Sequence, residues 1–168
     1  MNKKSERLNE DEMFDLFDQT DFSKVEVFVE KYGINSVDRD GRNLLINFII
    51  EHKSNFAIKL INEFKELNIN KQDKNDWSAL HFAVQENDLK VVTTLLKKES
   101  QVDIVDENGN TPLADAIFNE VDENIIISLL ENGASLNKKN HHGISPKDFI
   151  NKDMSKVVEW IKKNSELK

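Results

Sequence analysis

The sequence has no cysteine, only five glycines and two prolines, and no long apolar run. Without cysteine, the chain cannot form disulfide bonds or use thiolate chemistry. The longest apolar stretches, 44–50 and 125–130, are far too short to cross a bilayer. The opening segment, MNKKSERLNEDE, lacks the apolar core that signal peptides need, so we expect a cytoplasmic protein without membrane contact.

Basic residues are missing from one long segment, 99–137, which contains nine acids. They are Glu99, Asp103, Asp106, Glu107, Asp115, Glu120, Asp122, Glu123 and Glu131. The formal net charge of the whole chain is −8, so this segment accounts for the imbalance. Nucleic acid is an unexpected partner, since phosphate binding needs clustered Lys and Arg, whereas a basic protein is favoured. A solvated acidic surface that only maintains solubility would leave the same pattern.

The 168 residues suggest one domain, and its few glycines are regularly placed. Gly41, Gly109 and Gly143 are separated by 68 and 34 residues, as if one member of a 34-residue series were missing. Asp76 lies in the gap, and Asp is among the few residues that tolerate a positive φ. We therefore expect equivalent turns at these four positions.

The two prolines repeat at the same distance, because Pro112 and Pro146 are 34 residues apart. Each follows a hydroxyl residue, Thr111 or Ser145, and this pair is a signal for the start of a helix. Apolar residues then recur at helical spacing on both sides of a polar break, as in Leu80, Ala83, Val84, Val91, Val92, Leu95 and Leu96. Each unit thus contains a turn, two short helices and a loop. Helices this short must pack on neighbouring units, as in a solenoid.

Three segments resemble the ankyrin repeat, whose signature is close to D-x-x-G-x-T-P-L-H-x-A followed by V-V-x-L-L. The best matches are 73–83 (DKNDWSALHFA) and 106–113 (DENGNTPL), with a looser copy in 38–45 (DRDGRNLL). The loop signature recurs at 34–35, 69–70, 102–103 and 136–137. The resemblance covers about 11–163 and implies an all-α solenoid of helix–turn–helix units joined by β-hairpin-like turns.

On this basis we divide the single domain, 1–168, into an N-terminal cap (11–37), three repeats (38–72, 73–105 and 106–139) and a C-terminal cap (140–163). The copies depart from the signature at several positions. Ile46 and Ala114 replace its His, Asp76 replaces a turn Gly, and the last repeat has an extra residue around Val121–Asn124. Atypical terminal units are expected, because their outer faces meet water.

No group of residues indicates an enzyme, a cofactor or a metal site. His81 occupies the signature position at which the resemblance implies a hydrogen bond across the turn, while His141 and His142 lie at an expected turn tip. Asp103 and Asp106 recur at equivalent places in other repeats, which is typical of turn formers rather than of acid–base pairs. The sequence contains no G-x-S-x-G, phosphate-binding glycine loop or H-E-x-x-H motif.

The resemblance instead implies a protein-binding surface, the concave face, formed by the turn tips and the exposed side of each first helix. The candidate partner-binding residues are Arg42, Ile50, Trp77, Gln85, Glu86, Asp106, Glu107, Asn108, Asn110, Asp115, Phe118, Asn119, Glu120, Asp122, Glu123, His141, His142 and Ile144. Trp77 at an exposed tip is a candidate hot spot, although it could instead fold over a neighbouring turn. Four acids belong to one repeat, so we expect a compact acidic patch at Asp106, Glu107, Asp115 and Glu120.

Two functions are compatible with these features. The first is an inhibitor that blocks a basic partner such as a toxin, because small, acidic, cysteine-free chains resemble bacterial immunity proteins. An acidic patch could mimic a nucleic-acid backbone and would steer a basic partner. The second is a scaffold or adaptor that links proteins without inhibiting them, and an enzyme with an unrecognised site ranks third. In the first two cases we expect a monomer that binds a protein.

Overall fold

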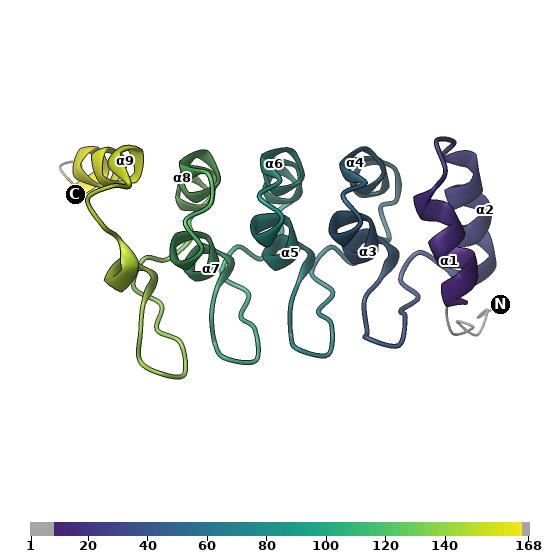
Figure 1. Ribbon diagram of the computed structural model, residues 1–168, viewed down its shortest axis with the longest axis horizontal. Coiled ribbons are helices and arrows are strands. Elements are labelled where there is room, and N and C mark those ends of the chain that lie inside the picture. Colours follow the sequence, from purple (N-terminus) through teal and green to yellow (C-terminus); the bar gives the residue numbers. More distant parts are fainter. Residues whose placement is uncertain (1–8, 166–168) are drawn as a thin grey trace.

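The computed structural model describes residues 9–165 and shows a row of helix pairs with hairpins along one side (Figure 1). Within this range the structure contains helices and no strand. The helices are α1 (Glu10–Phe17), α2 (Ser23–Tyr32), α3 (Leu44–Ile50), α4 (Ser54–Glu63), α5 (Ala79–Gln85), α6 (Leu89–Lys97), α7 (Pro112–Phe118), α8 (Glu123–Glu131), the 3-10 turn η1 (Pro146–Phe149) and α9 (Ser155–Ser165). The prediction of an all-α repeat solenoid is confirmed.

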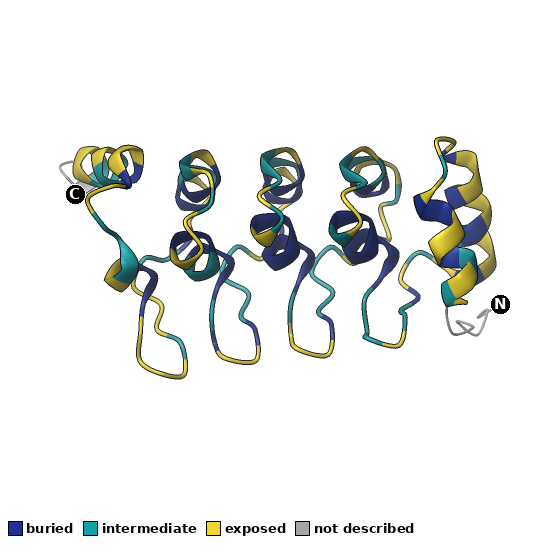
Figure 2. Ribbon diagram, in the orientation of Figure 1, coloured by how far each residue is buried: buried dark blue, intermediate teal, exposed yellow. Residues whose placement is uncertain are grey.

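The core runs along the stack between the two rows of helices. Each first helix packs against the next, in the order α3, α5, α7 and η1, and the second helices α4, α6, α8 and α9 form a parallel row. The buried residues lie on the sides of the helices that face neighbours (Figure 2). In α6 they are Val91, Val92, Leu95 and Leu96, and α8 repeats this spacing with Ile125, Ile126, Leu129 and Leu130. None of the described helices combines the length and the apolar character needed to cross a membrane.

The first helices begin at the side-chain caps that the sequence suggests. Thr111 accepts a hydrogen bond from the backbone N–H of Ala114, and Pro112 follows it as the first helical residue. Ser145 is likewise followed by Pro146, but here the chain forms only the four-residue turn η1. The last unit therefore lacks a complete first helix.

Each hairpin is braced by one side-chain oxygen at its start. The Oδ1 atom accepts hydrogen bonds from the backbone N–H groups of the residues two and four positions further on, in Asp38, Asp73, Asp106 and Asn140. In the third hairpin these bonds reach Asn108 and Asn110 at 2.9 and 2.8 Å. Asp76 has a φ of +59°, close to the turn glycines, so the prediction that it replaces a turn glycine is confirmed.

Successive hairpins are joined by backbone hydrogen bonds near their tips. The N–H of Lys74 donates to the carbonyl of Asp40 at 2.9 Å, and the same bond recurs from Glu107 to Asn75 at 3.2 Å and from His141 to Asn108 at 2.9 Å. Gly109 lies where a Cβ would come within 2.9 Å of the His141 ring, so this close approach requires glycine. The hairpins therefore form a continuous ladder.

At the N-terminal end of this ladder a side chain replaces the missing hairpin. The N–H of Arg39, equivalent to that of Lys74, donates to the Glu10 carboxylate at 3.1 Å. The Arg39 side chain also approaches Glu10, with Nε 3.7 Å from Oε2. The Glu10 carboxylate thus accepts the backbone N–H that, in each later hairpin, donates to a carbonyl of the preceding hairpin.

The helices fit the expected division into five units with small differences, and the division itself stays a prediction. α1 begins at Glu10, one residue before the expected N-terminal cap, and α9 extends to Ser165, two residues past the expected C-terminal cap. The extra residue expected near Val121–Asn124 falls in the break between α7 and α8. This break has four residues, 119–122, against three, 86–88, between α5 and α6.

The hairpin brace can be tested at Asp106, which is 4% exposed. Asp106→Ala removes the acceptor of two backbone N–H groups, so we expect it to lower the free energy of unfolding by about 2–4 kcal/mol. Asp106→Asn keeps an Oδ1 acceptor, as Asn140 does in the last hairpin, and should cost less than half as much. Urea unfolding monitored by circular dichroism measures both. Equal losses in the two variants would show that the charge of Asp106, and not its acceptor geometry, stabilises the hairpin.

Candidate protein-binding surface

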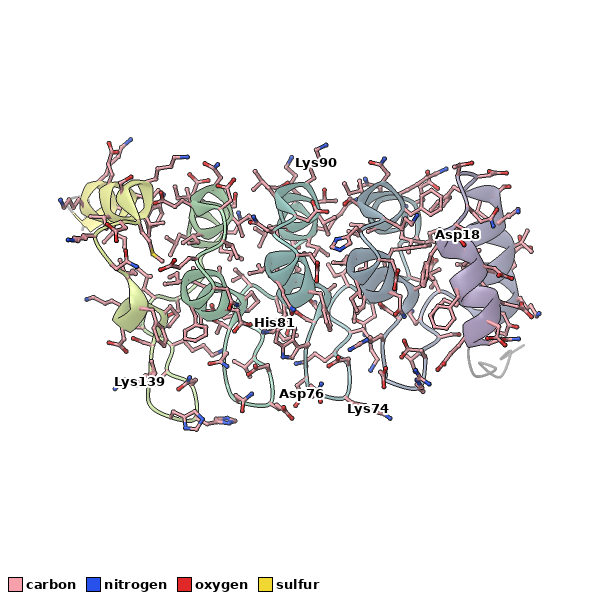
Figure 3. All side chains as sticks on the ribbon, in the orientation of Figure 1. Asp18, Lys74, Asp76, His81, Lys90 and Lys139 are labelled. Atoms are coloured by element: carbon pink, nitrogen blue, oxygen red, sulfur yellow. The ribbon has the colours of Figure 1, made fainter. Side chains whose placement is uncertain are left out.

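The hairpin tips and the first helices α3, α5 and α7 lie along the same side of the stack (Figure 1). We refer to this combined surface as the concave face. The tip residues Lys74 and Asp76 lie at the far end of a hairpin, whereas Lys90 on α6 lies on the opposite side of the molecule (Figure 3). The predicted partner-binding residues are distributed between the tips and the ends of the first helices.

Trp77 is half-buried, so of the two alternatives for this residue the structure favours the one in which the side chain folds over its neighbours, and a role in partner binding stays a prediction. Its ring lies 5.2 Å from that of Phe82 and 5.7 Å from that of His81, measured between centroids. Arg42 covers Phe82 from the preceding hairpin, with its guanidinium carbon 5.3 Å from the ring centroid, and also contacts Asp73 at 3.4 Å. Arg42 therefore links two repeats, Trp77 packs within its own repeat, and both present only part of their surface to a partner.

The exposed apolar residues gather toward the C-terminal part of the face. Phe118 at the end of α7 is 65% exposed, and Ile144 in the last hairpin is 39% exposed. The Phe118 ring makes an edge contact with Phe149, at 5.2 Å between centroids. Ile50, at the equivalent end of α3, is half-buried against the core, so it does not offer a comparable anchor.

Phe149 was not among the residues expected from the sequence, although it helps to position Phe118. It lies in η1 at the place that Phe82 takes in α5, 67 residues earlier. The repeat spacing identifies Phe149 as the equivalent of Phe82. The sequence pattern did not show that this unit lacks a complete first helix, which leaves the Phe149 ring half-buried.

Several acids of the expected patch serve the fold. Asp106 is buried in its hairpin, so the expectation that it faces a partner is wrong. Asp122 is exposed but caps α8 through the N–H of Asn124, and Glu123 accepts the N–H of Val157 at 2.9 Å near the start of α9. The acidic patch is therefore smaller than the sequence suggests.

Asp115 in α7 is half-buried, and its Oδ2 atom has no hydrogen-bond partner among the described residues. Burial, together with the smaller effect of the nearby charge of Asp106, raises the pKa of this carboxyl to about 7. In α3 the equivalent residue is Asn47, whose amide donates to Asp38 at 3.0 Å. Asp115 thus lies near the like charge of Asp106, whereas the amide of Asn47 at the equivalent position in α3 forms a hydrogen bond with Asp38.

Two of the expected acids remain available, and both belong to the third repeat. Glu107 is exposed at a hairpin tip, and Glu120 is exposed in the break after α7, where it accepts a bond from Asn151 at 3.4 Å. The ion pairs of the described residues use acids outside 99–137, as in His52–Glu86 at 3.5 Å. Glu107 and Glu120 therefore keep their charge for a partner.

The remaining candidates are polar groups on the same surface. Gln85 and Asn119 are exposed at the ends of α5 and α7, and His141 and His142 are exposed at the last hairpin. Asn108 is also exposed, with its carbonyl used in the ladder. The side chain of Asn110, another candidate, already forms hydrogen bonds within the fold. Its Nδ2 donates to Asp106 at 3.3 Å, and its Oδ1 accepts from Asn140 at 2.8 Å.

His81 is fully buried and bridges two repeats (Figure 3). Its Nδ1 accepts the backbone N–H of Ser78 at 3.1 Å, while Nε2 lies 3.3 Å from the carbonyl of Asn110 in the next hairpin. Burial lowers the pKa of His81, which favours the neutral ring that this pattern of one acceptor and one donor requires. Among residues 9–165 no cluster of three or more His, Cys, Asp or Glu has the arrangement of a metal site.

Comparison with known proteins agrees with this geometry. The family described as Ankyrin repeats (3 copies) matches residues 17–106 and 65–140. An ankyrin repeat protein of Borreliella burgdorferi is 26% identical over 142 residues, which cover 84% of this chain and 33% of that protein. A protein of Dictyostelium discoideum named as a serine/threonine-protein kinase is 34% identical over 91 residues, 52% of this chain and 9% of the relative. The chain thus spans a third or less of these relatives.

The strained carboxylate gives a pH-dependent prediction. Because the pKa of Asp115 rises from 3.8 to about 7 on folding, the protonated form is favoured in the fold, and stability is lost as the pH rises through 7. Asp115→Asn should therefore raise the free energy of unfolding by about 2–4 kcal/mol at pH 8 and by much less at about pH 4.

Urea unfolding at the two pH values measures this difference. Asp76→Asn makes the same chemical change at an exposed hairpin tip and serves as the control. If Asp115→Asn stabilises the protein equally at both pH values, or not at all, the burial of a charged group at this position is not a source of strain.

Proposed function

The chain belongs to the ankyrin-repeat family, a family of protein-binding modules, and we propose that it inhibits a basic protein by covering it with the concave face. The observation that carries this proposal is the exposure of Phe118 close in the chain to Glu120, an exposed acid that forms no ion pair among the described residues. An aromatic anchor beside unpaired charge is typical of interface hot spots, whereas an isolated apolar residue on a polar surface is not.

The arrangement suits a partner with both apolar and basic groups. Phe118 and Ile144 supply apolar contact, and in the third repeat Glu107 at the hairpin tip and Glu120 after α7 supply negative charge. The whole segment 99–137 carries nine acids without Lys or Arg, so its field extends beyond the individual contacts and speeds the encounter with a cationic surface. A bacterial toxin with a basic active site, such as a nuclease, has the required chemistry. In this proposal the chain is the immunity protein that blocks it.

An adaptor is the second candidate function. It is favoured by the relative from Dictyostelium discoideum, in which similar repeats occupy a small part of a protein named as a kinase. An adaptor would use the same face to hold a partner, without blocking its activity and without requiring a basic surface. The two candidates therefore differ in what happens to the partner after binding.

The proposal predicts that capture of the partner depends on charge at named positions. The tagged chain is expressed in its host of origin, captured at low salt and eluted with a salt step. Glu107→Lys with Glu120→Lys should weaken the binding of the captured protein about tenfold or more. The control is Glu99→Lys with Glu131→Lys, which makes the same charge change at the ends of α6 and α8. Equal effects of the two pairs would show that net charge, and not the concave face, governs binding.

The apolar anchor and the inhibitory role are tested on the same complex. Phe118→Ala should cost about 2 kcal/mol of binding free energy, measured by calorimetry, because the ring has nothing else to stabilise beyond its edge contact with Phe149. A captured protein that is toxic when expressed alone and harmless with the chain supports the inhibitor. A captured protein whose activity is unchanged in the complex favours the adaptor.

A further inference from the structure

The C-terminal end of the stack contains an open apolar cavity of about 410 Å³. Four aliphatic side chains line it, from the loop after α8 (Leu136), from just past η1 (Ile150) and from α9 (Val158 and Ile161). Two lysines, Lys147 and Lys162, also line it. The cavity exists because the last unit has the four-residue turn η1 where the other repeats have a seven-residue helix.

Comparison of α9 with α8 of the preceding repeat shows what kind of surface lines this cavity. The apolar pattern of α8, with Ile125, Ile126 and Leu129, recurs in α9 as Val157, Val158 and Ile161. Ile126 and Leu129 are fully buried because the next helix pair covers them, whereas Val158 and Ile161 are only half-buried. The open face is therefore the surface that a further helix pair would cover in the interior of a stack.

The N-terminal end presents a helix pair with an exposed apolar residue. Val27 on α2 is 65% exposed, on the side of the helix opposite to the buried Val25 and Phe28. Glu26 and Glu30, one turn apart on the same helix, are also exposed and lie to one side of Val27. This end thus presents an aliphatic side chain beside two carboxylates.

The two ends also carry opposite net charge. Residues 1–37 contain nine acids and five basic residues, and residues 138–168 contain eight basic residues and four acids. The end that has the cavity is basic, and the end that has the exposed valine is acidic. The net charges of the two ends of one molecule are therefore complementary.

We propose that copies of this chain associate head to tail, with the α1–α2 pair of one copy seated on the C-terminal face of the next. Val27 enters the cavity, and Glu26 and Glu30 lie near Lys147 and Lys162. The contact joins two different surfaces, so it is heterologous and does not close on itself. Each copy then extends the solenoid of its neighbour, and the concave faces continue from copy to copy. This association goes beyond the monomer expected from the sequence and does not depend on the proposed function.

Sedimentation velocity on the full chain tests the proposal. At about 0.5 mM protein and low salt, the average mass should exceed that of a dimer and keep rising with concentration, and about 0.5 M NaCl should weaken association tenfold or more. A wild-type chain that stays monomeric under the low-salt condition overturns the proposal, and the cavity then serves another ligand.

Two variants block one end each. Val27→Lys places a cation where the lysines of the cavity lie, and Lys147→Glu with Lys162→Glu reverses the charge at the cavity. All three residues are exposed, so the variants should fold, which thermal melting checks. Each variant alone should be monomeric. Lys90→Glu with Lys97→Glu makes the same charge change on α6, away from both ends, and should associate like the wild type.

Mixing the two blocked variants gives the sharpest readout. Val27→Lys retains an intact cavity, and Lys147→Glu with Lys162→Glu retains an intact Val27. An equimolar mixture should therefore form a dimer and nothing larger. A mixture that remains monomeric, or single variants that assemble like the wild type, would show that these two ends do not contact each other.

Discussion

The structure depends on one repeated hydrogen-bonding arrangement, in which a side-chain oxygen at the start of each hairpin accepts two backbone N–H groups. Asp38, Asp73, Asp106 and Asn140 all act in this way. The hairpins have almost no strand pairing of their own, with isolated bridges only at Val37–Asn43 and Gln72–Ser78 among the described residues. Without the brace, two backbone donors of each hairpin would lose their acceptor within the protein, and the tips would not align for the ladder that joins one repeat to the next.

This requirement explains why acidic content is a poor guide to the binding surface. Some acids of segment 99–137 accept hydrogen bonds within the fold, because Asp106 braces a hairpin and Asp122 caps a helix. Glu123 pairs the N–H of Val157 in the next unit. What remains for a partner is a smaller set, in which Glu107 at a hairpin tip, Glu120 after α7 and the ring of Phe118 are exposed.

The two terminal units differ in how they end the stack. At the N-terminal end, the Glu10 carboxylate pairs the N–H of Arg39 in place of a preceding hairpin. At the C-terminal end, η1 shortens the first helix and leaves the face of α9 partly open. Short helices are stabilised by packing on neighbouring units, so a partly open apolar end is a place where a further helix pair could pack.

The sequence by itself determined the repeat, because turn residues and helix starts follow local rules. The spacing of Gly41, Gly109 and Gly143, the substitution by Asp76 and the Thr111–Pro112 start were all readable and are confirmed. Local rules depend only on neighbouring residues, so an alignment of short segments is sufficient to find them.

Only the tertiary structure decided which surface residues are free. Trp77 turns onto Phe82, and Asp106 turns into its hairpin, although both lie at expected tip positions. Phe118 stays exposed at the end of α7, as Gln85 does at the end of α5, and its ring makes an edge contact with Phe149 of the next unit. The spacing of residue types does not state which way a side chain turns or which groups it contacts, because these depend on how the chain packs around it in three dimensions.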